Sequence, residues 1–168
     1  MPVLSRLLSP FYPRSPPLTE LERQCVRDAI ARLPPEQRAA FLSIWNIYLD
    51  RPGFIYCLLQ YCFDPTSGWW FPLIKYGLSS NLELRMEAYN ACFPSTWLFY
   101  WPTRCVKVTE AIIHARLRAR GIGVDAFYCC CGHCHREFFW GWGIYDVCRE
   151  VEEVLFDTAQ PIIRYAFP

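Results

Sequence analysis

FIYCLLQYCF, residues 54–63, is a nearly uninterrupted apolar and aromatic stretch whose conformation decides the fold of the chain. Pro52 and Gly53 precede it, and DPTSG, residues 64–68, forms a turn by composition. The stretch carries no charge, but it is shorter than the roughly 20 residues that a membrane-spanning helix needs. We therefore predict a buried helix over residues 54–63, inside a folded domain and not in a membrane.

Five further helices are predicted on either side of this stretch, from capping residues or prolines at their starts and apolar residues at helical spacing. Their expected starts are Thr19, Pro34, Ser80, Thr103 and Ile144. Residues 69–78 are expected to be irregular, and residues 97–101 to form a short strand or an extended segment. The predicted fold class is mainly α, a single compact helical domain with a C-terminal zinc-stabilised segment.

The apolar stripes of these helices define the expected core. The residues expected to face it are Leu21, Cys25, Ile30 and Leu33 in the first helix, Phe41, Leu42, Trp45, Tyr48 and Leu49 in the second, Leu82, Met86 and Tyr89 in the helix from Ser80, and Val147, Val151, Val154 and Leu155 in the last. Gly121 is expected to stop the helix that ends at Arg120, because glycine readily adopts the left-handed conformation.

With 168 residues, the chain can build one hydrophobic core but is too short for two full domains. Residues 1–18 form a proline-rich flexible tail. Residues 19–168 form the helical domain, in which zinc is expected to support about residues 103–160. A content of 53% hydrophobic and 17% aromatic residues excludes a disordered chain.

Charge and cysteine content limit the partners and the compartment. The formal net charge of +1 gives no overall field that would attract nucleic acid or an acidic membrane. The N-terminal segment has no apolar signal-peptide core, so we expect a protein that stays inside the cell, in the nucleus or the cytoplasm. In that reducing environment the ten cysteines are thiols or metal ligands and not disulfides.

Four of the cysteines and two of the three histidines lie in CCCGHCH, residues 129–135. Cys131 and Cys134 have the two-residue gap of a zinc knuckle, and thiolates and imidazoles favour tetrahedral zinc. Cys148 is the expected third ligand, since it follows Cys134 by fourteen positions and begins the last helix. The fourth ligand stays open among Cys129, Cys105, His114 and His135. One structural zinc ion is therefore the expected cofactor.

A redox function competes with the zinc site. Phe127 and Tyr128, followed by CGHC at residues 131–134, resemble the active-site segment of protein disulfide isomerases, which implies thiol-disulfide exchange through Cys131. The segment after the motif is too short for the rest of such a fold. Other catalytic patterns, among them a nucleophile elbow and a phosphate-binding glycine loop, do not occur in the sequence, so we expect a protein that is not an enzyme.

The helix expected over residues 104–120 is rich in basic residues, which makes it a candidate surface for nucleic acid. The candidate residues are Arg104, Lys107, Arg116, Arg118 and Arg120. The alternative is that this helix faces the acidic residues of the last helix, in which case its charge cannot reach phosphates. The acidic residues are Asp146, Glu150, Glu152, Glu153 and Asp157.

Residues 69–71, 97–101 and 138–142 are dense in tryptophan, tyrosine and phenylalanine. Core packing would account for most of these rings. Any that stay exposed would form a binding surface for another protein, because such rings dominate binding hot spots.

Two short segments resemble viral regulatory proteins. Residues 130–134, with a later cysteine leading into a charged helix, resemble the cysteine-rich segment of the large adenoviral early-region-four regulator, which recruits a host ubiquitin ligase. Residues 99–104 are similar to a segment of bocaparvovirus accessory nucleoproteins. These resemblances imply a non-catalytic viral accessory or adaptor protein that binds a host protein, such as a ubiquitin-ligase component, through its aromatic surface. A nucleic-acid-binding regulator and a thiol-disulfide oxidoreductase are the alternatives.

Overall fold

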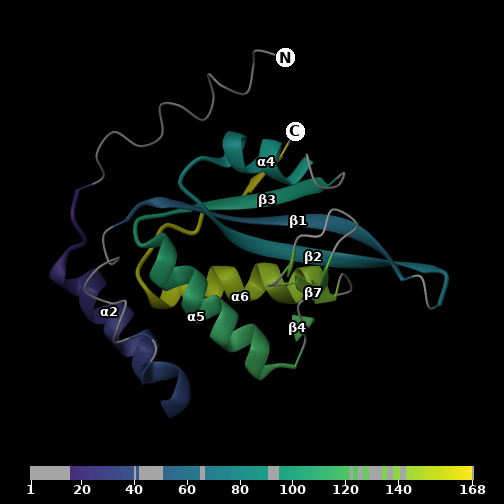
Figure 1. Cartoon of the computed structure of the whole chain (residues 1–168). Helices are drawn as coiled ribbons and strands as arrows, with labels where there is room; N and C mark the ends of the chain where they lie inside the picture. Colours follow the sequence, from purple (N-terminus) through teal and green to yellow (C-terminus); the bar gives the residue numbers. More distant parts are fainter. Residues whose placement is uncertain are drawn as a thin grey trace.

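The computed structural model of the chain describes residues 16–39, 41, 51–64, 67–90, 95–121, 123–124, 127–128, 134–135, 138–140 and 143–167. Its helices are α2 (Glu20–Ala31), α4 (Leu82–Asn90), α5 (Val106–Ala119) and α6 (Ile144–Asp157), and residues 35–39 are also helical. Figure 1 shows these helices arranged on two sides of a twisted sheet.

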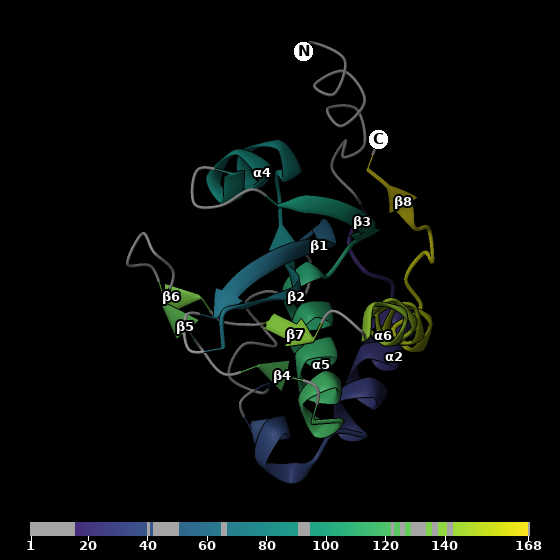
Figure 2. The ribbon, with the colours of Figure 1, turned by 90° about the vertical axis from the view of Figure 1, so that its right-hand side faces the viewer.

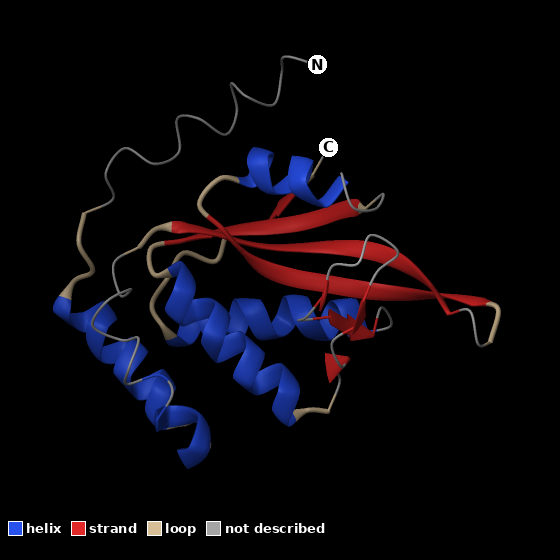
Figure 3. Cartoon of the chain, viewed as in Figure 1, coloured by secondary structure: helices blue, strands red, loops and turns tan. Residues whose placement is uncertain are grey.

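Six strands form one antiparallel sheet in the order β4-β7-β2-β1-β3-β8 (Figure 3). They are β1 (Gly53–Asp64), β2 (Trp69–Ser79), β3 (Thr96–Thr103), β4 (Gly123–Val124), β7 (Phe138–Trp140) and β8 (Tyr165–Ala166). A separate short pair consists of β5 (Phe127–Tyr128) and β6 (Cys134–His135). The long strands β1 and β2 form the centre of the sheet.

The prediction of a mainly α fold is wrong, because residues 54–63 form strand β1 and not a buried helix. Strand β1 lies between β2 and β3, and helices cover both of its faces. A strand buried on both faces is apolar at successive positions, so it lacks the alternation that marks a half-exposed strand. Residues 69–78, expected to be irregular, form most of β2. The fold is therefore a mixed α and β fold built on an antiparallel sheet.

The two faces of the sheet carry separate hydrophobic cores (Figures 1 and 2). Helix α4 covers one face, where Leu82 packs in one cluster with Phe54 and Tyr56 of β1. Helices α2, α5 and α6 cover the other face, and Ile55 and Cys57 belong to that core. Successive residues of β1 thus point into different cores, as the geometry of a strand requires.

Several details of the predicted helices are confirmed. Thr19 and Glu22 form the expected capping box at the start of α2. The four residues of α6 that were expected to face the core are all buried. Gly121 has a φ of +69° directly after α5, in the left-handed region where glycine avoids the cost that a side chain would bring.

Other details are wrong. Leu21 is 71% exposed, and Val26 and Ala29 line the core side of α2 instead. Thr103 does not cap a helix; it is the last residue of β3, and Cys105 occupies the N-cap position of α5. Of the stripe expected in the second helix, Phe41 is buried, whereas Leu42, Trp45, Tyr48 and Leu49 lie outside the described residues.

Candidate functional site

Tyr56 of β1 lies opposite Gly77 of β2, and the two residues fit only because Gly77 has no side chain. A Cβ atom placed on Gly77 would lie 2.8 Å from the hydroxyl oxygen of Tyr56 and 3.1 Å from its Cζ atom. The first contact is shorter than real Cβ atoms make, and the second is tighter than most Cβ contacts. Gly77 therefore makes room for the phenol, which is the usual reason for a glycine in the interior of a strand.

Helix α4 brings two further side chains to this phenol. The hydroxyls of Tyr56 and Tyr89 share a hydrogen bond, and Arg85 lies close enough to act on Tyr56 electrostatically. The two tyrosine rings meet edge to face, with their centroids 6.3 Å apart, and the ring of Trp97 lies 4.9 Å from that of Tyr56. Arg85 is exposed and Tyr89 is half-buried, whereas Tyr56 is only 2% exposed. Tyr56 thus forms the floor of the site.

Helix α5 adds a carboxylate. Glu110 also acts electrostatically on the Tyr56 phenol, and its side chain is half-buried. The hydroxyl of Tyr76, the neighbour of Gly77 in β2, donates a hydrogen bond to the backbone oxygen of Glu110. This bond ties α5 to the strand beside the site. We refer to Tyr56, Arg85, Tyr89 and Glu110 as the Tyr56 cluster.

The electrostatics of the Tyr56 cluster keep its central phenol neutral. Burial is the largest cause that raises the pKa of Tyr56, and the charge of Glu110 and the hydrogen bond to Tyr89 act in the same direction. Arg85 opposes them by favouring the phenolate. The net pKa lies well above the ordinary value of 10.0, so Tyr56 carries its proton at neutral pH and can donate it in a hydrogen bond.

Lys75 lies two residues before Gly77 in β2, so its side chain leaves the sheet on the same face as Tyr56. It is 5% exposed, and its ammonium nitrogen lies 5.5 Å from the centre of the Phe138 ring. This contact with Phe138 directs the ammonium group toward β7. The Tyr56 cluster itself offers one guanidinium, one carboxylate and two phenols, which suits binding of a phosphate ester.

Comparison with known proteins finds one family for this chain. Residues 53–157 match the T5orf172 domain family, over more than half of the sequence. The chain belongs to this family. The matched region runs from the first residue of β1 to the last residue of α6, so all residues of the Tyr56 cluster lie within the T5orf172 domain. No curated protein and no solved structure matches the chain. The two viral resemblances, at residues 99–104 and 130–134, are not tested by these comparisons and stay predictions.

Part of the expected zinc site of this T5orf172 domain lies outside the described residues. Cys129 and Cys131 are not described. Of Cys134 and His135, only the backbone is described, in β6. The CGHC segment of the redox hypothesis, residues 131–134, is likewise described only at Cys134. Within the described part of the chain, no group of three or more His, Cys, Asp or Glu residues could hold a metal ion. The zinc site and the redox site therefore stay predictions.

The remaining candidate ligands lie in the main core. The Cys57 thiol of β1 donates a hydrogen bond to the sulfur of Cys148 in α6; this bond and burial raise the pKa of Cys57 well above its ordinary value. His114 is buried in α5, with its ring centroid 4.7 Å from that of Tyr76. Cys105 is fully buried at the start of α5.

Among the basic residues expected to bind nucleic acid, Arg104, Arg116 and Arg120 form ion pairs within the chain. The partners are Glu22 for Arg104, Glu150 and Asp157 for Arg116, and Asp146 and Glu150 for Arg120. Helix α5 thus faces the acidic helix α6, as the alternative interpretation of this helix expected. Lys107 is half-buried, and Arg118 is exposed.

The aromatic segments divide between core and surface. Trp101 of β3 and Phe138 and Phe139 of β7 are almost fully buried. Trp69 and Trp70, at the start of β2, are 71% and 63% exposed. Residues 141–142 lie outside the described part of the chain.

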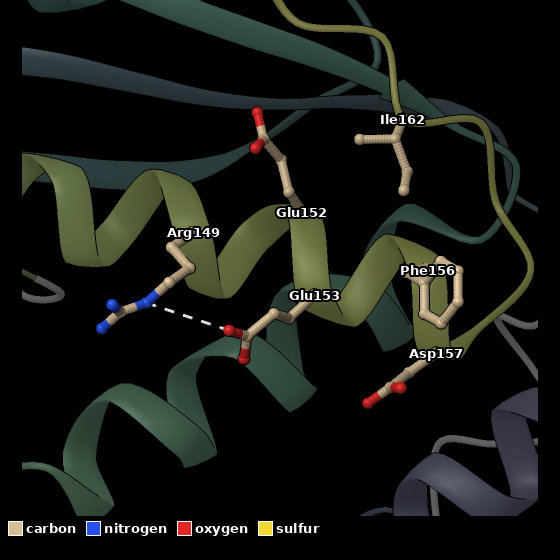
Figure 4. A pocket seen from close by; sticks show the side chains of 6 residues that line it. All are labelled: Arg149, Glu152, Glu153, Phe156, Asp157 and Ile162. Carbon is tan, nitrogen blue, oxygen red and sulfur yellow. Dashed lines mark ion pairs between the residues drawn. The ribbon is translucent and has the colours of Figure 1, made fainter.

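A shallow groove of about 490 Å³ lies along the outer side of α6 (Figure 4). Its lining consists of Arg149, Glu152, Glu153, Phe156, Asp157 and Ile162. Each of its carboxylates pairs with an arginine: Glu152 with Arg164, Glu153 with Arg149, and Asp157 with Arg32 and Arg116. Because these ion pairs neutralise the groove, we place the candidate site at the Tyr56 cluster.

Among the described helices, none is long and apolar enough to cross a membrane.

None of the residues in the Tyr56 cluster was identified as functional from the sequence. Tyr89 was expected in the core, and Tyr56 inside a buried helix. One signal was available: a lone glycine between strand-like residues, at Gly77, marks a close approach of another group. Arg85 and Glu110 carry no such local signal, because only the fold brings them to Tyr56.

Proposed function

We propose that this T5orf172 domain is a nuclease, with the Tyr56 cluster as its active site. Two facts support the proposal. Domains of this family are often nuclease-like. In addition, a guanidinium, a carboxylate and two phenols from three different elements act on one another around a single buried hydroxyl. This second observation carries the proposal, because phosphodiester hydrolysis needs groups of these kinds at one place.

Arg85 is the phosphate-binding group in this proposal. It extends from the exposed side of α4, and its planar guanidinium can form two parallel hydrogen bonds with the non-bridging oxygens of a phosphodiester. Hydrolysis adds water across one P–O bond: the water oxygen bonds to phosphorus, the ester oxygen leaves, and the proton from water ends on the leaving oxygen. Positive charge at Arg85 stabilises the negative charge that builds up on the phosphate during this step.

The two phenols orient the phosphate. The hydrogen bond between the two phenols holds the hydroxyl of Tyr89 in place, and this half-buried hydroxyl can in turn form a hydrogen bond with a phosphate oxygen. Tyr56 itself is too deeply buried to meet the phosphate first. Its raised pKa keeps this hydrogen bond intact at neutral pH, so Tyr56 acts by positioning Tyr89 and not as a general base.

Glu110 is the residue that would hold a divalent cation. Its carboxylate is half-buried beside the cluster, and magnesium is usually bound by one or two carboxylates together with substrate phosphates. Such an ion would polarise a phosphate oxygen and lower the pKa of bound water. Glu110 is therefore expected to be needed for cleavage.

The proposal is tested by cleavage of supercoiled plasmid and of labelled oligonucleotides by the full chain with magnesium or manganese. We expect Arg85→Ala to lower the cleavage rate by about 100-fold, the usual loss when a group that stabilises a developing charge is removed. Tyr56→Phe should also lower the rate, because Tyr89 then loses the hydroxyl that positions it. The controls Tyr145→Phe, an exposed tyrosine of α6, and Glu87→Gln, an exposed residue of α4, should keep the rate. Failure of the unmodified chain to cleave any of these substrates would contradict the proposal.

A second candidate is the non-catalytic protein-binding role expected from the sequence, inside the cell and with a host protein as partner. The exposed Trp69 and Trp70 favour it. If the chain shows no nuclease activity and a partner protein stays bound to it at high salt, these results would support the protein-binding role and not the nuclease.

A further inference from the structure

The far ends of β1 and β2 form a two-stranded ribbon that extends away from the rest of the sheet (Figures 1 and 3). Strand β1 pairs with β3 only up to Leu59, and β2 pairs with β7 only from Leu73 onward. Beyond these points, residues 60–64 and 69–72 pair only with each other among the described residues. We call these two segments the ribbon.

The ribbon exposes four large aromatic rings. They are Tyr61 (58% exposed), Phe63 (51%), Trp69 (71%) and Trp70 (63%). The rings of Phe63 and Trp70, which are direct partners across the two strands, have centroids 5.2 Å apart. Trp69 follows the opposite parity and extends from the other face of the ribbon. Exposed rings thus occupy both faces, as in an element that inserts between two surfaces.

The ribbon has no positive charge with which to hold phosphates. No lysine or arginine occurs between Arg51 and Lys75, and the only charged residue in that interval is Asp64. If the ribbon contacts nucleic acid, it must therefore contact the faces of the bases. Aromatic rings stack on bases with little dependence on their sequence, and unpaired bases offer both faces.

We infer that the ribbon stacks on unpaired bases of the nucleic acid whose phosphate is held at the Tyr56 cluster. This inference rests on the proposed function. Strand β1 carries both Tyr56 and one side of the ribbon, so their relative position is fixed. From Tyr56 to Phe63 the strand rises by about 23 Å, at about 3.3 Å per residue. The ribbon therefore contacts bases several nucleotides away from the phosphate that is cleaved, and it prefers single-stranded or frayed substrates.

The test measures binding of labelled oligo(dT) and of a blunt duplex to the full chain carrying Glu110→Gln, which prevents cleavage. Trp69→Ala with Trp70→Ala should weaken binding of oligo(dT) by about 10- to 100-fold, the usual effect of losing base stacking. The dependence of affinity on salt should stay unchanged, since no phosphate contact is lost. Trp69→Phe with Trp70→Phe should restore most of the affinity. Tyr145→Ala, which removes an 85% exposed ring from α6, is the matched control.

Hydrolysis of bis(4-nitrophenyl) phosphate separates this inference from the proposed function. This small diester is too short to reach the ribbon, so the two alanine substitutions should leave its hydrolysis unchanged. If the chain without these substitutions does not hydrolyse the diester, that result refutes the proposed function and not the inference about the ribbon. Unchanged binding of oligo(dT) to the double alanine variant would overturn the inference. It would also be overturned if the substitutions abolished self-association or capture of a protein without affecting oligo(dT), because the ribbon would then be a protein-binding surface.

Discussion

At the scale of single residues, the account depends on the close approach of Tyr56 and Gly77. The missing side chain of Gly77 lets the phenol lie across β2, and the hydrogen bond to Tyr89 then fixes the position of the hydroxyl. Sequence analysis could not find this pair. Each residue is ordinary for a buried segment, and the pairing of Tyr56 with Gly77 depends on the register of two strands that were not predicted.

Gly77→Ala tests this approach directly. The new Cβ atom would lie 2.8 Å from the hydroxyl oxygen of Tyr56, so the phenol must move. We expect a loss of about 1–3 kcal/mol in the free energy of unfolding, as for other overpacked sites. Combining Gly77→Ala with Tyr56→Phe removes the shortest contact, so the double variant should be more stable than the sum of the single effects. Additive effects in urea denaturation would contradict this close packing.

At the scale of elements, the sequence predicted the amphipathic helices well and the central strands poorly. Helices α2, α5 and α6 have one buried face, so their spacing of apolar residues identified them, although only in α2 was the capping residue correct. Strand β1 is buried on both faces and gives no alternation. Pro72 and Gly77 made β2 look irregular, but Pro72 lies on the ribbon, where a missing backbone donor costs little at a free edge.

Glu22 joins α2 to the start of α5. Burial raises the pKa of Glu22, but hydrogen bonds from Thr19 and the ion pair with Arg104 outweigh it, so the net pKa is lowered below its ordinary value of 4.5. Because the pKa of Glu22 is lowered in the folded chain, its charge stabilises the fold at pH values above its pKa in the unfolded chain. This contribution is lost as the pH falls below about 4.5. Glu22→Gln should therefore cost about 1–2 kcal/mol at neutral pH and less in acid.

Thermal denaturation of the unmodified chain and of Glu22→Gln, at several pH values from neutral to acidic, checks the prediction for Glu22. Glu20→Gln is the matched control, since Glu20 lies on the same helix with an exposed side chain and should change stability little. An equal loss for Glu22→Gln at every pH would show that the charge of Glu22 contributes nothing to stability.

The cysteine-rich segment, residues 129–135, is the element for which the zinc prediction can be tested. We expect about one equivalent of zinc in the purified chain, lost in Cys131→Ser and in Cys134→Ser, because a structural site needs all of its ligands. Cys62→Ser, in the ribbon, should keep the metal. Metal analysis of the four proteins measures this, and a zinc-free chain with an unchanged melting curve would refute the prediction.

At the scale of the whole molecule, the fold assembles the Tyr56 cluster from elements that are distant in sequence. Tyr56 comes from β1, Arg85 and Tyr89 from α4, and Glu110 from α5, whose backbone is tied to the sheet by Tyr76. The sheet lies between the layers of helices, so residues from both sides can act on one phenol (Figure 2). The sequence contains all of these residues, but their proximity follows only from the order and register of the strands.

The most direct test of this account is the rate of DNA cleavage under single-turnover conditions with magnesium, compared between Glu110→Gln and its control Glu83→Gln. Both substitutions replace a glutamate with its neutral amide, but only Glu110 belongs to the Tyr56 cluster. We predict that Glu110→Gln lowers the rate by about 100-fold or more while Glu83→Gln keeps it. Equal rates for Glu110→Gln and the unmodified chain would contradict an active site at the Tyr56 cluster.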